Sequence, residues 1–207
     1  MIGSLVYLFL HVIRKRDIEN VQEGVITVLD PSKKIKVLEK QLHFSETFEN
    51  RVALADELMR SHAWQQAIEH YKAALKDMFK NDFYVHTRLQ EAFFKLNDYE
   101  ASLSYANAIM EQADFKKSDA HFLYAMALDK MGRSDEAERQ LLFFDAPYNY
   151  YPQRLELARL FRRRHKNEKA LEVYKEMVKE SENMSKQSYK ANKNVLQIAR
   201  QELSEMN

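Results

Sequence analysis

One short pattern returns four times between residues 48 and 181, and it constrains the fold of this 207-residue chain more than any other feature. Each copy has an alanine followed four residues later by a large apolar side chain. The alanines that mark the copies, spaced by 34, 36 and 33 residues, are Ala67, Ala101, Ala137 and Ala170. A period near 34 residues is typical of stacked helical hairpins that bury one another's apolar faces. The pattern therefore predicts an all-α solenoid of about four hairpins.

Twelve residues before each marker the chain has Ala55, Leu89, Ala125 or Ala158, so three of the four residues are small. Two helices approach to about 8–10 Å between their axes only where small side chains let the backbones come close. We therefore expect alanines to lie at the contacts between helices. The predicted packing residues are Ala55, Ala67, Ala74, Ala101, Ala108, Ala125, Ala137, Ala158 and Ala170.

These residues resemble the motif of the tetratricopeptide repeat, which has a small residue in each helix and an aromatic residue in the second helix. Tyr71, Tyr105 and Tyr174 supply the aromatic residue, whereas the third copy has Leu141. The second copy departs further, since its turn at residues 96–99 is one residue short, and no copy ends in proline. The resemblance implies first helices over about 48–60, 83–95, 118–130 and 152–164, and second helices over about 64–78, 99–111, 134–145 and 168–181.

Composition agrees with an all-α chain and excludes several kinds of site. Three glycines do not suffice for a phosphate-binding loop, and the absence of cysteine excludes a thiolate metal site. The seven histidines are scattered and form no metal-ligand pair on one helix. A net charge of +1 gives no overall field that would attract nucleic acid. We expect no enzymatic activity, no cofactor, no metal and no nucleic-acid partner.

The first thirteen residues are apolar and are followed at once by Arg14, Lys15 and Arg16. A bilayer-spanning helix needs about 20 apolar residues, so this run is too short on its own. Three interpretations are open: the end of a longer membrane helix that starts upstream, an interfacial anchor, or a core helix that packs on the solenoid.

Residues 3–9 (GSLVYLF), the basic cluster after them and residues 50–56 (NRVALAD) resemble a bacterial family of membrane-anchored tetratricopeptide-repeat proteins. In that family a phospholipase-D-nuclease-type membrane hairpin, which implies no hydrolase activity, precedes the repeats. The resemblance implies that only the end of this hairpin is present here. Arg14, Lys15 and Arg16 would then mark the cytoplasmic side of the inner membrane.

The expected organisation follows from these observations. An anchor over residues 1–16 precedes a linker over 17–30 and a covering helix over 31–47. The repeats are expected at 48–81, 82–117, 118–150 and 151–183, and a capping helix with a polar outer face at 184–207.

In the tetratricopeptide-repeat family the first helices line a concave surface. The residues expected to project toward it mix apolar and charged side chains, which suits an extended peptide or a partner's helix. These candidate groove residues are Val52, Asp56, Met59, Thr87, Glu91, Phe94, Phe122, Met126, Arg159 and Arg162. Three of them, Phe94, Phe122 and Met126, could equally be core between adjacent repeats.

Two hypotheses for function follow. The first is a non-catalytic interaction scaffold, tethered to the cytoplasmic face of a bacterial inner membrane, that binds a protein or peptide client. The alternative is a soluble or peripheral module that binds anionic lipid or nucleic acid through its basic clusters. Those clusters are Arg14, Lys15 and Arg16 at the N-terminus and the run RRRHK at residues 162–166.

Overall fold

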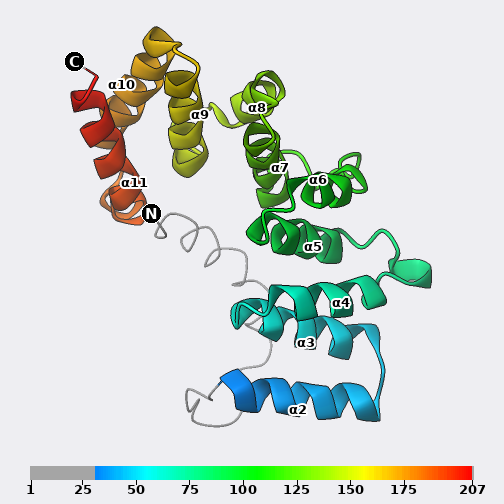
Figure 1. Cartoon of the computed structure of the whole chain (residues 1–207). Coiled ribbons are helices and arrows are strands. Elements are labelled where there is room, and N and C mark those ends of the chain that lie inside the picture. Colours follow the sequence, from blue (N-terminus) through cyan, green and yellow to red (C-terminus); the bar gives the residue numbers. More distant parts are fainter. Residues whose placement is uncertain (1–30, 207) are drawn as a thin grey trace. The chain divides into compact units, whose positions relative to one another are not determined.

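The computed structural model describes residues 31–206, and every regular element within them is a helix (Figure 1). The helices belong to two compact units, which meet between Phe115 and Lys116 in the sequence. The helices of the first unit are α2 (Pro31–Phe44), α3 (Phe48–Arg60), α4 (Trp64–Ala74), the short 3-10 helix η2 (Asp77–Phe79), α5 (Phe83–Lys95) and α6 (Tyr99–Asn107). Those of the second are α7 (Asp119–Lys130), α8 (Ser134–Leu141), the 3-10 helix η3 (Leu142–Phe144), α9 (Tyr151–Arg163), α10 (Asn167–Asn183) and α11 (Lys186–Ser204).

The first unit is built from two hairpins, α3–α4 and α5–α6, and α2 packs on the first of them. Helix α4 also packs on α5, so apolar side chains of both hairpins share one core. Helix α2 contributes Ile35, Leu38 and Leu42 to this core. These residues are three and four positions apart, so they lie on one face of the helix.

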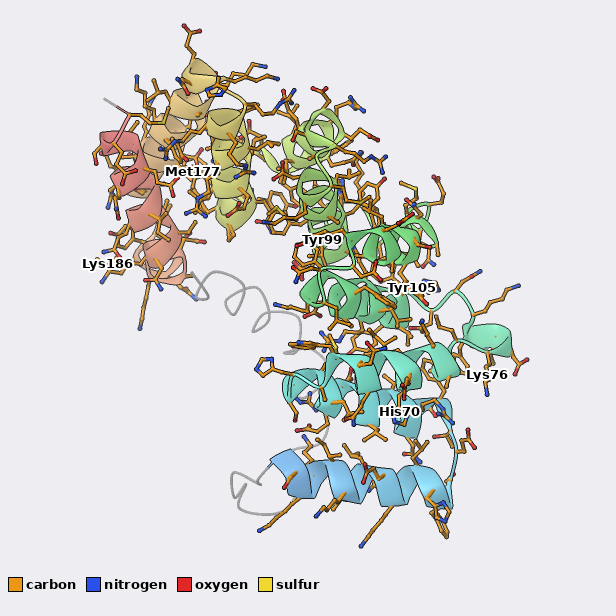
Figure 2. The ribbon with its side chains drawn as sticks, in the orientation of Figure 1. His70, Lys76, Tyr99, Tyr105, Met177 and Lys186 are labelled. Atoms are coloured by element: carbon orange, nitrogen blue, oxygen red, sulfur yellow. The ribbon has the colours of Figure 1, made fainter. Side chains whose placement is uncertain are left out.

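The second unit has the same construction. Hairpins α7–α8 and α9–α10 pack on each other through α8 and α9, and α11 covers α10 and part of α9. Leu128, Leu141, Leu157, Tyr174 and Met177 are fully buried within this unit. Figure 2 shows Met177 on α10 and Lys186 at the start of α11.

A three-residue turn of one geometry closes all four hairpins. Its middle residue has a positive φ and is His62, Asn97, Gly132 or His165, with φ of 60°, 62°, 75° and 57°. In the first turn the N–H of Ala63 donates to the carbonyl oxygen of Leu58 at 2.9 Å, and that of His62 to Met59 at 3.1 Å. The other three turns repeat this pair of bonds, which caps the exposed carbonyls of the first helix.

The turns define the register of the second helices, and this register corrects the sequence prediction for the second hairpin. Five residues after each turn's middle residue lies a fully buried small residue: Ala67, Ser102, Ala137 and Ala170. Ser102 therefore takes the place that was assigned to Ala101. The turn over residues 96–98 is as long as the other three and is not one residue short.

The same shift of one residue moves two further predicted positions. Ala101 and Tyr105 are only half-buried and Ala108 is exposed, whereas Ala106 and Ile109 are buried. In the first helix of this hairpin, buried Gln90 stands where the other hairpins have Ala55, Ala125 and Ala158. The Ser102 hydroxyl donates to the carbonyl oxygen of Gln90 at 2.9 Å, so a polar contact joins the helices here.

The other predicted packing alanines are buried: Ala55, Ala67, Ala74, Ala125, Ala137, Ala158 and Ala170. The first helices lie close to their predicted ranges, but α4, α6 and α8 end earlier than predicted. The predicted anchor (1–16) and linker (17–30) lie outside the described residues. The boundaries between repeats stay predictions. None of the helices within residues 31–206 has the length and apolarity that crossing a bilayer requires.

The register makes a testable distinction between two adjacent residues. Ser102→Leu forces a larger side chain into a fully buried contact and should lower the free energy of unfolding by about 1–3 kcal/mol. Ala101→Leu, at a half-buried position, should change it by less than about 1 kcal/mol. Urea unfolding followed by circular dichroism measures both. A larger loss for the Ala101 variant would contradict the register of the structure.

Candidate interaction surfaces

The structure buries four of the ten predicted groove residues. Val52 and Met59 belong to the core of the first unit, and Glu91 is also buried there. Phe122 is buried in the second unit, where its ring meets that of Phe144 edge-on at 5.9 Å. These four side chains do not face solvent, so the assignment of Val52, Met59 and Glu91 to a ligand-binding surface needs correction. For Phe122 the burial agrees with the alternative expectation of a core side chain. The physical reason is that neighbouring helices of the same unit cover this part of each first helix.

Asp56 is half-buried and serves as a junction between α3, α4 and α5. Its carboxylate accepts hydrogen bonds from the hydroxyl of Tyr84 at 2.8 Å and from that of Tyr71. The guanidinium of Arg88 lies 3.6 Å away and pairs with Glu91 at 2.6 Å. Burial raises the pKa of both tyrosines, and the negative charge of Asp56 raises it further. The tyrosines therefore stay protonated as donors, and Asp56 stabilises the packing of three helices.

Three predicted groove residues remain partly accessible. Thr87 and Phe94 lie seven residues apart on α5, which places them on one face of that helix. The ring of Phe94 also meets Tyr99 edge-on at 5.3 Å. Met126 is half-buried on α7 in the second unit. Ligand binding by these residues stays a prediction.

Arg159 and Arg162, the last two predicted groove residues, pair with the C-terminal helix. Glu202 of α11 accepts from Arg159 at 2.6 Å and lies 3.5 Å from Arg162. The hydroxyl of Tyr174 donates to the same carboxylate at 2.6 Å. Burial opposes ionisation of Glu202, but the hydrogen bonds from Arg159 and Tyr174 outweigh it and lower the pKa of the carboxyl. An anionic ligand would have to displace Glu202 from these arginines.

The basic run at residues 162–166 is also largely paired within the second unit. Arg163 pairs with Asp129 of α7 at 2.6 Å, and Arg164 pairs with Asp135 and Glu138 of α8. Lys166 adds a second cation to Glu138 at 2.6 Å. These contacts join α9 and the turn after it to the preceding hairpin. The run is therefore not a free cationic patch for lipid or nucleic acid, as the alternative hypothesis required.

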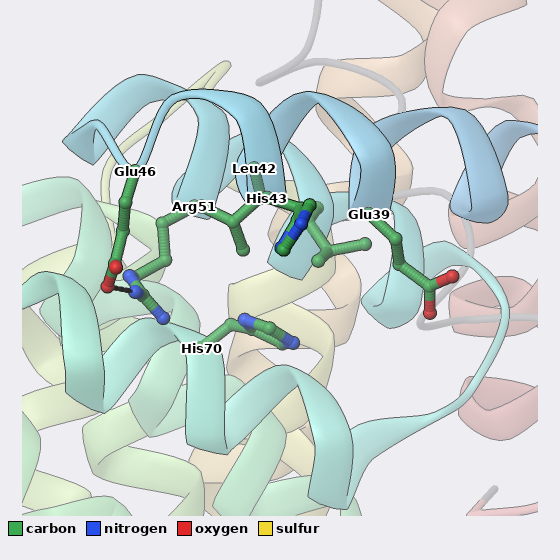
Figure 3. Close-up of a pocket in the computed structure, with 7 residues that line it drawn as sticks. Glu39, Leu42, His43, Glu46, Arg51 and His70 are labelled. Carbon is green, nitrogen blue, oxygen red and sulfur yellow. Dashed lines mark hydrogen bonds and ion pairs between the residues drawn. The ribbon is translucent and has the colours of Figure 1, made fainter.

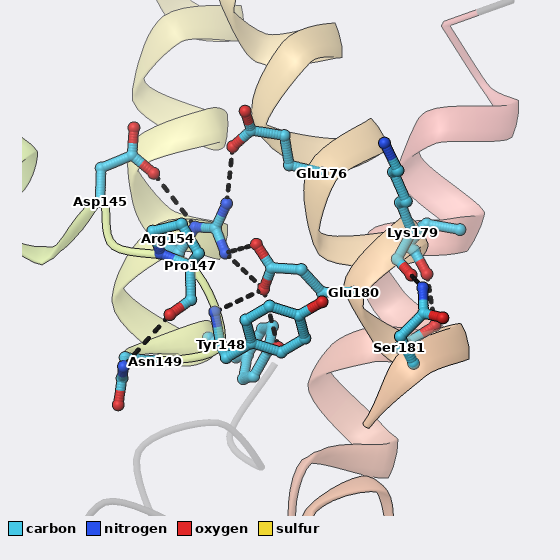
Figure 4. A network of polar contacts seen from close by, with 12 residues as sticks. Asp145, Pro147, Tyr148, Asn149, Arg154, Glu176, Lys179, Glu180 and Ser181 are labelled. Atoms are coloured by element: carbon cyan, nitrogen blue, oxygen red, sulfur yellow. Dashed lines mark hydrogen bonds and ion pairs between the residues drawn. The ribbon is translucent and has the colours of Figure 1, made fainter. Parts of the chain in front are cut away.

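Sequence reasoning missed a buried arginine at the start of α9. Arg154 is fully buried and pairs with Glu180 of α10 at 2.8 Å, with Glu176 at 2.8 Å and with Asp145 at 3.1 Å (Figure 4). Glu180 also accepts from the hydroxyl of Tyr151 and the N–H of Tyr148, both at 2.8 Å. The network holds the connection between α8 and α9 against α10. No spacing in the sequence distinguishes Arg154 from the more accessible arginines that follow it.

A groove of about 400 Å³ lies in the first unit between α2, α3 and α4 (Figure 3). Its lining residues are Glu39, Leu42, His43, Glu46, Arg51, Leu54 and His70. Arg51 pairs with Glu46 at one end. Burial and then the charge of Arg51 lower the pKa of His70, so its imidazole is neutral at pH 7. Among the described residues no group of three or more acidic or histidine side chains could hold a metal ion.

No protein-family model matches the sequence, and no curated protein matches it. Solved structures do resemble the fold. A MamA double mutant superposes with a TM-score of 0.68 at 16% identity, over 77% of this chain and 89% of that chain. A fragment of MamA from Desulfovibrio magneticus RS-1 gives 0.67 at 17% identity, over 75% and 88%. YrrB, described as a TPR protein with an unusual peptide-binding site, gives 0.59 at 16% identity, over 84% and 85%.

The chain has a fold of the tetratricopeptide-repeat (TPR) type. The resemblance to YrrB, together with the repeated hairpins and turns described above, agrees with the all-α solenoid expected from the sequence. In this TPR-type fold the first helices carry the partly accessible Thr87, Phe94 and Met126.

The Arg154 network should be essential to the second unit of the TPR-type fold. Arg154→Met leaves Glu180 buried without its cation and should lower the free energy of unfolding by about 3–5 kcal/mol. Arg163→Ala removes a more exposed ion pair and should cost about 0–1 kcal/mol. Thermal or urea unfolding compares the two variants. Equal effects would show that the buried network contributes no more than the surface pair.

Glu202 should make stability depend on acid pH. The pKa of the Glu202 carboxyl is lower in the folded state than its ordinary value. The stability that the ionised carboxylate adds is therefore complete above the ordinary pKa, and it is lost as the pH falls through the folded-state pKa. Glu202→Gln should therefore be less stable than the wild type at pH 7, with the difference shrinking as the pH falls below the ordinary glutamate pKa of about 4.5. Glu182→Gln, at an exposed position on α10, is the matched control. Unfolding curves from pH 7 to below the ordinary glutamate pKa test the expectation, which a constant difference would contradict.

Proposed function

We propose that this protein is a non-catalytic interaction scaffold that binds a protein or peptide client on the exposed faces of its first helices. The supporting observation is the TPR-type fold, in which hairpins of one geometry repeat along the chain. The peptide-binding site named for YrrB, which resembles this chain over most of its length, supports a client of the same chemical class.

The strongest candidate for an anchor contact is the face of α5 that carries Thr87 and Phe94. The two side chains lie two turns apart and combine a partly accessible aromatic ring with a small polar group. Lys95, next to Phe94, adds a cation at the same end of the helix. An aromatic anchor flanked by polar groups is the usual core of a protein-binding surface. The client would therefore present an apolar side chain to Phe94.

The scaffold would act while tethered to the cytoplasmic face of a bacterial inner membrane. Support for this comes from the sequence of residues 1–16, in which an apolar run precedes Arg14, Lys15 and Arg16. A tether concentrates client and scaffold at one surface, and it raises the effective affinity without any new contact.

Site-specific photo-crosslinking tests the α5 face. A photo-reactive residue in place of Thr87 should capture discrete protein partners in the native cells. Phe94→Ala/Lys95→Glu in the same chain should reduce that capture about tenfold or more, because an aromatic anchor contributes about 2 kcal/mol. Ser104→Glu/Asn107→Glu, at exposed positions on α6, should leave it unchanged. Circular dichroism of all variants confirms that they fold.

Equal capture by both double variants would exclude the α5 face as the binding surface. Capture that requires Arg162 or Arg163 and disappears at high salt would instead favour a charge-driven contact.

A further inference from the structure

The outer face of α2 combines cations with exposed apolar side chains. Phe44 is 93% exposed and Val37 is 53% exposed. Lys33, Lys36 and Lys40 are exposed on the same side of the helix, opposite the stripe that packs on the first unit's core. With 3.6 residues per turn, these five residues form one strip along the helix.

The charges of this strip are not neutralised by the described part of the chain. Lys34, on the flank of α2, pairs with Glu57 of α3 at 2.9 Å. Lys33, Lys36 and Lys40 form no ion pair with any residue from 31 to 206. The single acidic residue of α2, Glu39, lines the groove toward α4 instead (Figure 3). Within the described residues the strip therefore carries three cations without an acidic partner, beside an exposed aromatic ring.

The shape and charge of the strip select among possible occupants. It is one face of a single helix, so it cannot enclose an extended peptide. A second copy would bring the same cations against each other in a two-fold contact, which like-charge repulsion disfavours. A layer of anionic lipid headgroups offers negative charge together with a boundary into which Phe and Val side chains can insert.

The position of α2 in the chain agrees with a lipid surface. Only sixteen residues separate Arg16 from Lys33, which span at most about 60 Å when fully extended. Helix α2 is also the first described helix after the apolar N-terminal run. A chain held at a bilayer by residues 1–16 therefore keeps α2 within reach of that surface.

We propose that the outer face of α2 docks on the anionic headgroups of the membrane, with Phe44 and Val37 inserted at the interface. The proposal deepens the proposed function, since it rests on the N-terminal tether, and it assigns a second membrane contact. Such a contact would orient the first unit at the bilayer surface.

Tryptophan fluorescence in the full-length chain tests the contact. The sole tryptophan is replaced by phenylalanine (Trp64→Phe), and Phe44→Trp then places one reporter on the strip. Met78→Trp in the same background is the matched control, because Met78 is 85% exposed in η2 and lies outside the strip. The probes are vesicles of zwitterionic lipid and vesicles with about a third anionic lipid, both with brominated acyl chains that quench nearby tryptophan.

With anionic vesicles, the strip reporter of the Phe44→Trp variant should be quenched and the control reporter of the Met78→Trp variant should not. Lys33→Gln/Lys36→Gln/Lys40→Gln should abolish the quenching, since each lysine near an anionic surface strengthens binding about fivefold and three together on the order of 100-fold. Salt at about 1 M should also abolish it, because the Debye length is then about 3 Å. With zwitterionic vesicles the strip reporter should stay unquenched.

Flotation of the same samples separates this proposal from the tether. A chain that floats with zwitterionic vesicles is tethered, and an unquenched strip reporter on anionic vesicles would then overturn the α2 contact alone. Flotation only with anionic vesicles, with the strip reporter quenched, would support the α2 contact and overturn the tether. Failure to float with either kind overturns both. Quenching that persists after the lysine substitutions, or a strip reporter already shielded from acrylamide without vesicles, would also overturn the α2 contact.

Discussion

Close approach of two helix backbones is the constraint on which both units depend. A turn with one left-handed residue ends each first helix, and a fully buried small side chain follows it by five residues in the second helix. A larger side chain at that point would separate the helices and expose the apolar residues on either side. In three hairpins the small residue is alanine. In hairpin α5–α6 it is Ser102, whose hydroxyl also donates a hydrogen bond to the carbonyl oxygen of Gln90.

Buried and half-buried ionic groups decide which faces of the hairpins remain open to a partner. Asp56 is engaged by two tyrosines, Glu202 by two arginines, and Glu180 by Arg154. Each network joins two or three helices of one unit. Two of the networks engage charges that the sequence placed on the candidate groove, namely Asp56 in the first unit and Arg159 with Arg162 in the second. The exposed aromatic side chains include Phe44 on α2, Phe143 in η3 and Tyr148 before α9, whereas Phe94 on α5 is half-buried.

Two predictions from the sequence failed for related physical reasons. Ala101, Tyr105 and Ala108 copy the spacing of Ala67, Tyr71 and Ala74, yet the helix buries the residues one position later. The expected residue types are present in this hairpin, but which of them are buried depends on their distance from the turn and not on their type. Val52 and Met59 were placed on a binding face because of their position in the motif, and neighbouring side chains of their own unit cover them instead.

The sequence by itself determined that the described chain is helical, where its first helices lie and that the hairpins repeat. These properties follow from local signals: the apolar period, the turn residues and the small side chains. Only the tertiary structure decided the register of α6, the burial of Arg154 and the pairing of the basic run at residues 162–166. Those depend on which side chains other helices contribute, and a single stretch of sequence does not contain that information.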